Sequence, residues 1–137
     1  MDSATPIIET FKDSKKLELE FDKKKLQLNI EISSLELKFS GKFLNEIDPY
    51  SYENSFDKNS LTEIYKNFSI FDSLDDIMNI FVNLIENKEY SFHKNNEEEI
   101  KLIFKVNSLT KQEEIILILY KSNKLNKDDI INLCTFV

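Results

Sequence analysis

The sequence is poor in the residues on which most recognisable active sites depend. Its 137 residues contain one glycine, one histidine and one cysteine, and no arginine or tryptophan. A single glycine cannot build the loops that cradle nucleotide phosphates, and one histidine with one cysteine excludes zinc sites made of several such ligands. Without arginine, the chain lacks the planar fork that reads carboxylates, phosphates and guanine bases. We therefore predict a protein that is not an enzyme and that needs no cofactor and no metal.

The two potentially reactive side chains do not point to catalysis either. His93 lies next to a turn in a strand-like stretch that offers no obvious nucleophile, so we interpret it as an exposed strand residue. Cys134 lies among Ile131, Leu133 and Val137, which favours a small buried hydrophobic residue over a nucleophilic thiol.

Acidic residues outnumber lysines by 25 to 18, so the formal net charge is −7. Such a chain is repelled by nucleic acids and anionic membrane surfaces, and a basic protein is the better electrostatic partner. The acidic clusters at 75–76 and 97–99 are explained by a helix N-terminus and a solvated turn, and neither has the spacing of a calcium loop. The lysines at 23–25 are typical of a charged hairpin tip. We predict contact with a protein and none with nucleic acid.

The sequence also lacks long apolar runs. The longest, IILILY at 115–120, is far shorter than the roughly 20 residues that a membrane helix needs. The N-terminal residues MDSATPIIETF do not have the basic segment and apolar run of a secretory signal. We expect an intracellular, cytoplasmic protein that forms a single domain over residues 1–137, with residues 1–13 frayed.

Alternation of apolar and polar residues dominates the first third of the chain. This period of two is typical of strands with one solvated and one buried face. The alternating apolar residues form three groups: Leu17, Leu19 and Phe21; Leu26, Leu28, Ile30 and Ile32; Leu35, Leu37 and Phe39. Only short breaks separate the groups, which favours antiparallel neighbours and predicts a three-stranded meander.

Residues 45–59, NEIDPYSYENSFDKN, lack a clear period and are rich in turn formers, so we interpret them as a long surface loop. The loop contains three aromatic residues, Tyr50, Tyr52 and Phe56. These side chains either fold back onto the edge of the sheet, as aromatic residues usually do, or form an exposed contact surface for a partner.

Two helices are predicted after this segment. SLTE from Ser60 has the form of a capping box, in which Glu63 reaches back to the helix N-terminus. A second start at Ser73 opens a stronger helix whose apolar stripe should lie across the buried face of the sheet. The stripe comprises Leu74, Ile77, Met78, Phe81, Leu84 and Ile85.

Three further strands and a last helix complete the prediction. EYSFHK precedes a turn at Asn95 and Asn96, EIKLIFKV alternates, and EEIILILY is apolar on both faces, which indicates a central strand buried on both sides. LNKDDIINLCTFV contains a capping box from Asn126 to Asp129 and predicts a C-terminal helix. The expected fold class is α+β: an antiparallel sheet of about six strands, two helices between its two sets of three strands, and the C-terminal helix.

The C-terminal residues Thr135, Phe136 and Val137 also have two interpretations. A hydroxyl residue two positions before a terminal aliphatic residue resembles a PDZ-binding tail, which adds to a partner as a strand. The preceding helix signal favours a segment that packs against its own domain. Together with Tyr50, Tyr52 and Phe56, these three residues are the candidate partner contacts.

Residues 61–119, and especially FSIFDSLDDIMNIFVNLIENKEYSFHKNNEEEIKLIF, resemble a helix-strand-strand unit of uncharacterised lysine- and asparagine-rich protist proteins. The resemblance implies a fold unit rather than an activity. The order of elements is also similar to that of the globular heads of coiled-coil DNA-repair and centriole-assembly scaffolds, although their long heptad stalk is absent.

These features favour a non-enzymatic interaction or structural module, a subunit or adaptor that docks onto a larger protein through its sheet edge, middle loop or C-terminal segment. One alternative is an acidic inhibitor or immunity-type protein that binds a basic toxin or nucleic-acid enzyme. Another is a carrier of a small hydrophobic ligand, held in a cleft between helix and sheet lined by Phe81, Phe92 and Phe104.

Overall fold

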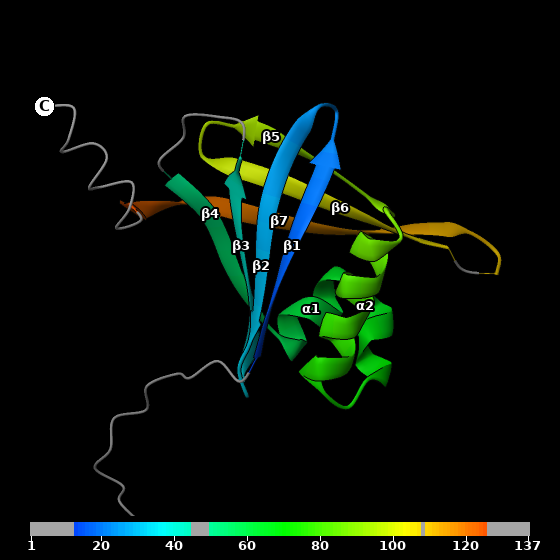
Figure 1. Ribbon diagram of the computed structural model, residues 1–137. Coiled ribbons are helices and arrows are strands. Elements are labelled where there is room, and N and C mark those ends of the chain that lie inside the picture. Colours follow the sequence, from blue (N-terminus) through cyan, green and yellow to red (C-terminus); the bar gives the residue numbers. More distant parts are fainter. Residues whose placement is uncertain (1–12, 45–49, 108, 126–137) are drawn as a thin grey trace, which may run out of the picture.

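A computed structural model describes residues 13–44, 50–107 and 109–125. In chain order its elements are β1 (Asp13–Phe21), β2 (Lys24–Ile32), β3 (Glu36–Phe43), β4 (Tyr50–Asp57), α1 (Lys58–Ile64), the 3-10 helix η1 (Lys66–Ile70), α2 (Leu74–Glu86), β5 (Tyr90–Asn96), β6 (Glu99–Asn107) and β7 (Gln112–Leu125). The strands form one antiparallel sheet in the order β1-β2-β3-β4-β7-β6-β5 (Figure 1). Every neighbouring pair is consecutive in the chain except β4 and β7.

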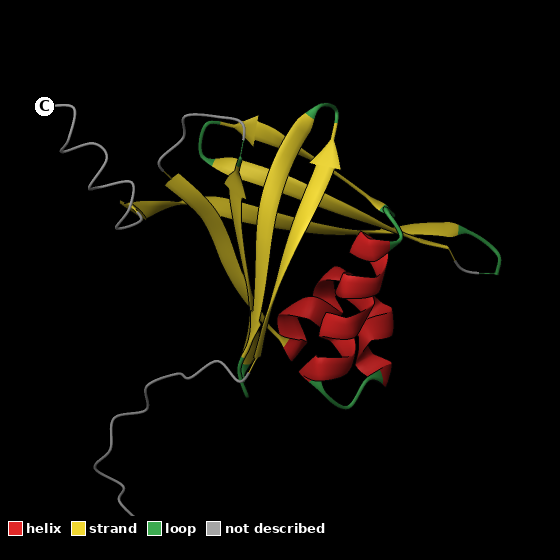
Figure 2. Ribbon diagram, viewed as in Figure 1, coloured by secondary structure: helices red, strands yellow, loops and turns green. Residues whose placement is uncertain are grey.

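The sheet curls into a half-barrel, and the helices gather at one end of it (Figure 2). The alternation seen in the sequence explains the core, because alternate apolar residues along the strands lie on the inner side and are buried there. Leu28, Leu37, Leu102 and Leu117, from four different strands, are all fully or almost fully buried. The inner side of the half-barrel is therefore the hydrophobic core.

Helix α2 packs against the inner side of the sheet and contacts strands from both halves of it. Its Phe81 ring lies 5.1 Å from Phe39 on β3 and 5.0 Å from Phe104 on β6, both in edge-to-face geometry, and 5.6 Å from Phe68 on η1. Four residues of the predicted stripe, Ile77, Met78, Phe81 and Ile85, are buried, and the other two, Leu74 and Leu84, are partly buried. The Ser73 cap is confirmed too, because its hydroxyl accepts a hydrogen bond from the Asp76 amide at 3.4 Å.

The one glycine lies at a close approach in the core. A Cβ atom on Gly41 of β3 would lie 3.2 Å from a methyl carbon of Leu26 and 3.6 Å from one of Leu119. Its backbone angles need no glycine, since no positive φ is recorded there. The close contact with Leu26 therefore accounts for the residue.

The two edge strands meet at one point of the curl. The Tyr90 hydroxyl accepts a hydrogen bond from the Glu20 amide at 3.0 Å and contacts the Glu20 carbonyl oxygen at 3.4 Å, where it donates. Beside it, the rings of Phe21 and Phe92 lie 5.9 Å apart. One side chain of β5 thus satisfies backbone groups at the open edge of β1, groups that an edge strand otherwise leaves to water.

The expected fold class is wrong in the number of strands. The sheet has seven, because residues 50–57, read from the sequence as part of the 45–59 loop, form β4. Its inner residues alternate as Tyr52, Asn54 and Phe56, and the polar Asn54 interrupts the apolar pattern. The Asn54 amide donates to the Ile118 carbonyl oxygen on β7 at 3.0 Å, a long-range partner that the local pattern does not reveal. The predicted C-terminal helix lies outside the described residues.

Two local predictions shift by a few residues. Helix α1 begins earlier than the Ser60 capping box, because the Asp57 carboxylate is the cap and accepts from the Ser60 amide at 2.8 Å. The β5–β6 turn falls at 97–98 rather than at Asn95 and Asn96, which belong to β5. There the Asn96 side chain accepts from the Glu98 amide at 2.7 Å, so it supports the turn from its flank.

Candidate protein-interaction surfaces

The aromatic residues predicted as contacts lie largely inside the molecule. Tyr52 is 1% exposed and Phe56 is 7% exposed, while Tyr50 is half-buried at the start of β4. Tyr52 packs edge-to-face against Phe43 at 6.2 Å, and Phe56 packs in the same way against Phe39 at 5.8 Å. The structure thus places these rings in the sheet rather than on a loop. Thr135, Phe136 and Val137 lie outside the described residues.

The cleft that a ligand carrier requires is filled. Phe81, Phe92 and Phe104 are each at most 2% exposed, and the Phe81 and Phe104 rings are in direct edge-to-face contact. Phe92 lies between Phe21 and Phe43, whose ring centres are 5.9 and 6.3 Å away. The Phe81–Phe104 contact therefore holds α2 to the sheet, and Phe92 packs among rings of the sheet itself.

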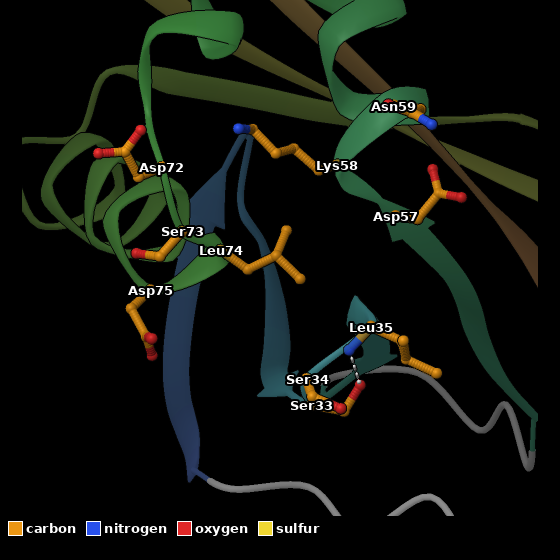
Figure 3. A pocket seen from close by; sticks show the side chains of 10 residues that line it. All are labelled: Ser33, Ser34, Leu35, Asp57, Lys58, Asn59, Asp72, Ser73, Leu74 and Asp75. Atoms are coloured by element: carbon orange, nitrogen blue, oxygen red, sulfur yellow. Dashed lines mark hydrogen bonds between the residues drawn. The ribbon is translucent and has the colours of Figure 1, made fainter.

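A hollow of about 430 Å³ opens at the helix end of the half-barrel (Figure 3). Three chain segments meet there: the β2–β3 turn, the start of α1 and the start of α2. The lining residues are Ser33, Ser34, Leu35, Asp57, Lys58, Asn59, Asp72, Ser73, Leu74 and Asp75. We call this feature the helix-end hollow.

The β2–β3 turn presents an apolar side chain at the rim of this hollow. The buried Ser33 hydroxyl accepts from the Leu35 amide at 3.2 Å and from the Glu36 amide at 3.1 Å, and the Ser33 amide donates to the Glu36 carbonyl oxygen at 3.0 Å. These bonds fix the backbone of the turn, yet Leu35 remains 65% exposed. Sequence alternation places Leu35 on an inner face, and the turn bonds explain why it lies outside.

The charges around the hollow are mostly negative. Asp57, Asp72 and Asp75 line it, against one cation, Lys58. The Ser60 backbone amide and hydroxyl, which hydrogen-bond to Asp57, hold the pKa of that carboxyl below its usual 3.8. The carboxylate therefore stays charged through neutral and mildly acidic pH, and its capping interaction is lost only as the pH falls below 3.8 through the lowered pKa. The hollow combines an apolar rim with anionic charge.

Lysines and aromatic rings meet at the opposite end of the sheet. The Lys94 ammonium lies 5.1 Å from the Phe43 ring centre and 5.7 Å from that of Tyr52, and the Lys121 ammonium lies 4.0 Å from that of Tyr50. Such distances are within the range of cation–π attraction. The residues come from β3, β4, β5 and β7, so the grouping has no local signature in the sequence.

The outer face of the sheet carries exposed apolar side chains on β7. Strand β7 occupies an interior position, as predicted, but it is not buried on both sides: Ile116 is 37% and Tyr120 is 51% exposed. Ile118 lies between them on the same face, and Ile103 of β6 pairs with Ile116; both are half-buried. We call these four side chains the outer strip.

The remaining candidates are solvated. His93 is exposed on β5, opposite Lys101. Within residues 13–44, 50–107 and 109–125, no group of three or more histidine, cysteine, aspartate or glutamate side chains is arranged to hold a metal ion. None of the helices in these ranges has the length and apolar character needed to cross a membrane.

Comparison with known proteins adds information on the fold. No protein-family model matches the chain, and a search of curated protein sequences finds no match. The structure is similar to the crystal structure of the head domain of human CCDC61, with a TM-score of 0.62 over 80% of this chain and 97% of that chain. Sequence identity is 8%, so the likeness concerns the fold alone.

Proposed function

We propose that the protein is a non-enzymatic interaction or structural module that docks onto a larger protein through the helix-end hollow. The observation that carries this proposal is Leu35, a largely exposed leucine held by a hydrogen-bonded turn beside a hollow. A fixed apolar side chain next to a concave surface is suited to a protein contact, since little conformational entropy is lost when it binds. The proposal includes a cytoplasmic location, inferred from composition.

The chemistry of the hollow indicates what the partner carries. Three carboxylates against one ammonium favour a basic segment, and the apolar rim favours an aliphatic or aromatic side chain within it. The likeness to a head domain supports a role as one part of a larger assembly, although the fold alone does not assign one.

The test is affinity purification from the source cell with the full chain as bait. We expect a partner in stoichiometric amount with the wild-type chain and its loss with Leu35→Asp. The matched control is Leu109→Asp, because Leu109 is a fully exposed leucine in the β6–β7 connection, away from the hollow. Retention of the partner by Leu35→Asp, or a wild-type chain that recovers no stoichiometric partner, would contradict the proposal.

The acidic lining also supports the second candidate, an inhibitor or immunity-type protein that covers a basic enzyme. That function relies on Asp72 and Asp75 more than on Leu35. Binding should then weaken steeply between about 0.05 and 0.5 M salt, because exposed charges are screened over that range. Asp72→Asn with Asp75→Asn should weaken it as well. Salt-insensitive binding that requires Leu35 would instead favour the adaptor.

A further inference from the structure

Strand β1 exposes part of its backbone at one border of the half-barrel (Figure 1). Among the described strands it pairs with β2 alone. The Glu20 amide donates to the Tyr90 hydroxyl rather than to β2, so the backbone groups of Glu20 point away from the sheet. Alternate residues of a strand direct their backbone groups to the same side, so those of Lys16 and Glu18 also point outward. Within the described ranges, neither residue has a backbone partner on that side.

The side chains along this open stretch carry charges in an order that complements itself. Lys16 and Glu18 are exposed on the outer face, and Leu17 between them is half-buried against the core. The Glu18 side chain is 57% exposed although its carboxylate lies 4.0 Å from the Lys25 ammonium, so it is open to a second cation. Charged residues on an edge strand ordinarily keep other strands away. A second β1 that runs antiparallel about Leu17 instead meets each charge with its opposite.

We propose that the β1 strands of two copies of the chain pair antiparallel about Leu17 and join the two sheets into one. Residues 16 and 18 of each copy then exchange backbone hydrogen bonds with residues 18 and 16 of the other, because their backbone groups point outward. Each Lys16 lies opposite Glu18 of the second copy on the outer face, and the two Leu17 side chains meet on the inner face. The proposal does not depend on the helix-end hollow.

The charges favour this register over its neighbours. Pairing about Lys16 would place that lysine opposite its own copy, and pairing about Glu18 would place two carboxylates opposite each other. Pairing about Leu19 would set Glu18 against Glu20 twice. Pairing about Leu17 gives two opposite-charge pairs and no like-charge pair directly across the strands.

The net charge of the chain makes the association weak and dependent on salt. Each copy carries a formal charge of −7, so two copies repel one another at low ionic strength. At about 0.15 M salt the screening length is about 8 Å, so distant charges are screened while groups about 5 Å apart across two strands still interact. Edge pairing buries less than the roughly 1,600 Å² of a standard interface. We therefore expect the dimer to be populated between about 0.1 and 1 mM chain.

Charge-swapped variants of the full chain test the pairing by sedimentation equilibrium. Lys16→Glu places carboxylates opposite each other in both pairs, and Glu18→Lys does the same with ammonium groups. We expect each variant alone to raise the dimer dissociation constant about tenfold or more. An equimolar mixture of the two variants should form a mixed dimer as readily as the wild-type chain dimerises, because every pair across the strands is again of opposite charge.

The matched control is Lys15→Glu. It changes the net charge as Lys16→Glu does, but this exposed residue lies opposite Leu19 in the proposed pairing, so dimerisation should stay close to wild type. Equal losses with the two lysine variants would show that net charge controls association and would overturn the proposal. A wild-type chain that stays monomeric at about 1 mM would overturn it as well, and leave the edge to a strand from a different protein. A mixture that dimerises no better than either variant alone would also contradict it.

Amide hydrogen exchange locates the contact without any substitution. Between about 0.05 and 1 mM chain, exchange of the Lys16 and Glu18 amides should slow about twofold or more, because the dimer adds hydrogen bonds to both. The Leu17 amide is the internal control, since it points towards β2 and its exchange should respond less. Slowing confined to another surface, such as the outer strip, would overturn the proposal in favour of a dimer through that surface.

Discussion

The sheet consists of two meanders, β1–β4 and β5–β7, whose inner faces are alike and whose outer faces are not. Leu28 and Leu37 in the first and Leu102 and Leu117 in the second are buried to the same degree in the core. Outward, Gln27, Asn29 and Glu31 follow one another on β2, whereas Ile116, Ile118 and Tyr120 do so on β7. The inner pattern accounts for the fold, whereas the outer faces differ in exposed apolar area, which is larger on the second meander.

The largest expected loss of stability tests whether the inner faces of both meanders depend on the same helix. Phe81→Ala should cost about 3–5 kcal/mol of unfolding free energy, because the ring contacts both meanders and its loss leaves a cavity. Urea denaturation measures the loss. Phe21→Ala, at a side chain that is 40% exposed, should cost less than half as much. If amide hydrogen exchange in this variant became faster in only one meander, α2 would not stabilise both meanders.

The next effect separates the inner from the outer face within one meander. Gly41→Val should cost about 1–3 kcal/mol, because the branched side chain must displace Leu26 from an already tight contact. The neighbouring outward substitution Ser40→Val should change stability by less than about 0.5 kcal/mol. Thermal unfolding of the two variants checks the difference, and equal losses would mean that Gly41 is not needed for packing.

A smaller effect concerns the point where the two meanders meet. Tyr90→Phe removes the hydroxyl that serves the Glu20 backbone and should cost about 0.5–1.5 kcal/mol. Exchange of the Glu20 amide hydrogen should quicken as well, which denaturation alone does not reveal. Tyr65→Phe is the control, because that hydroxyl accepts a hydrogen bond from the nearby Asn67 side chain and not from a backbone amide of an edge strand among the described residues. An unchanged Glu20 amide would show that the edge is held by ring packing alone.

The smallest effect tests the solvated outer face of the first meander. Lys38 on β3 and Glu53 on β4 approach to 3.7 Å with partly exposed side chains. Their coupling in a double-mutant cycle should be about 0.2–1 kcal/mol at low salt, as for other surface pairs. It should nearly vanish at about 1 M salt, where the screening length is short. A coupling that persisted at this salt concentration would mean that the pair is shielded from water, and the outer face of the first meander would then not be fully solvated at this point.

Sequence periodicity identified the elements whose partners are local. Alternation around Leu28 and Leu102, and the Ser73 cap before a helical stripe, depend on neighbours within one strand or helix. Strand β4 was not predicted, because its inner position is occupied by the polar residue Asn54. The side-chain amide of Asn54 donates a hydrogen bond to a carbonyl group on β7, far along the chain. The Asp57 cap was missed because SLTE offered a more familiar pattern three residues later.

The candidate surfaces were harder to infer for the same reason. Leu35 belongs to an alternating run, and only the bonds made by Ser33 show that it lies in a turn at the hollow. Tyr52 and Phe56 looked like spare aromatic residues until β3 was seen beside them. The sequence shows apolar residues on both faces of β7, from which we predicted that both faces are buried. The inner face is buried, but the outer face is partly exposed.

The pairing of β4 with β7 has a consequence for how the chain folds. It brings Tyr52 beside Lys121, whereas every other ladder joins strands that follow one another directly. Closing so long a loop loses more chain entropy than closing a hairpin, and non-local contacts slow folding. We therefore expect the two meanders to form early and independently, and the β4–β7 ladder to form last.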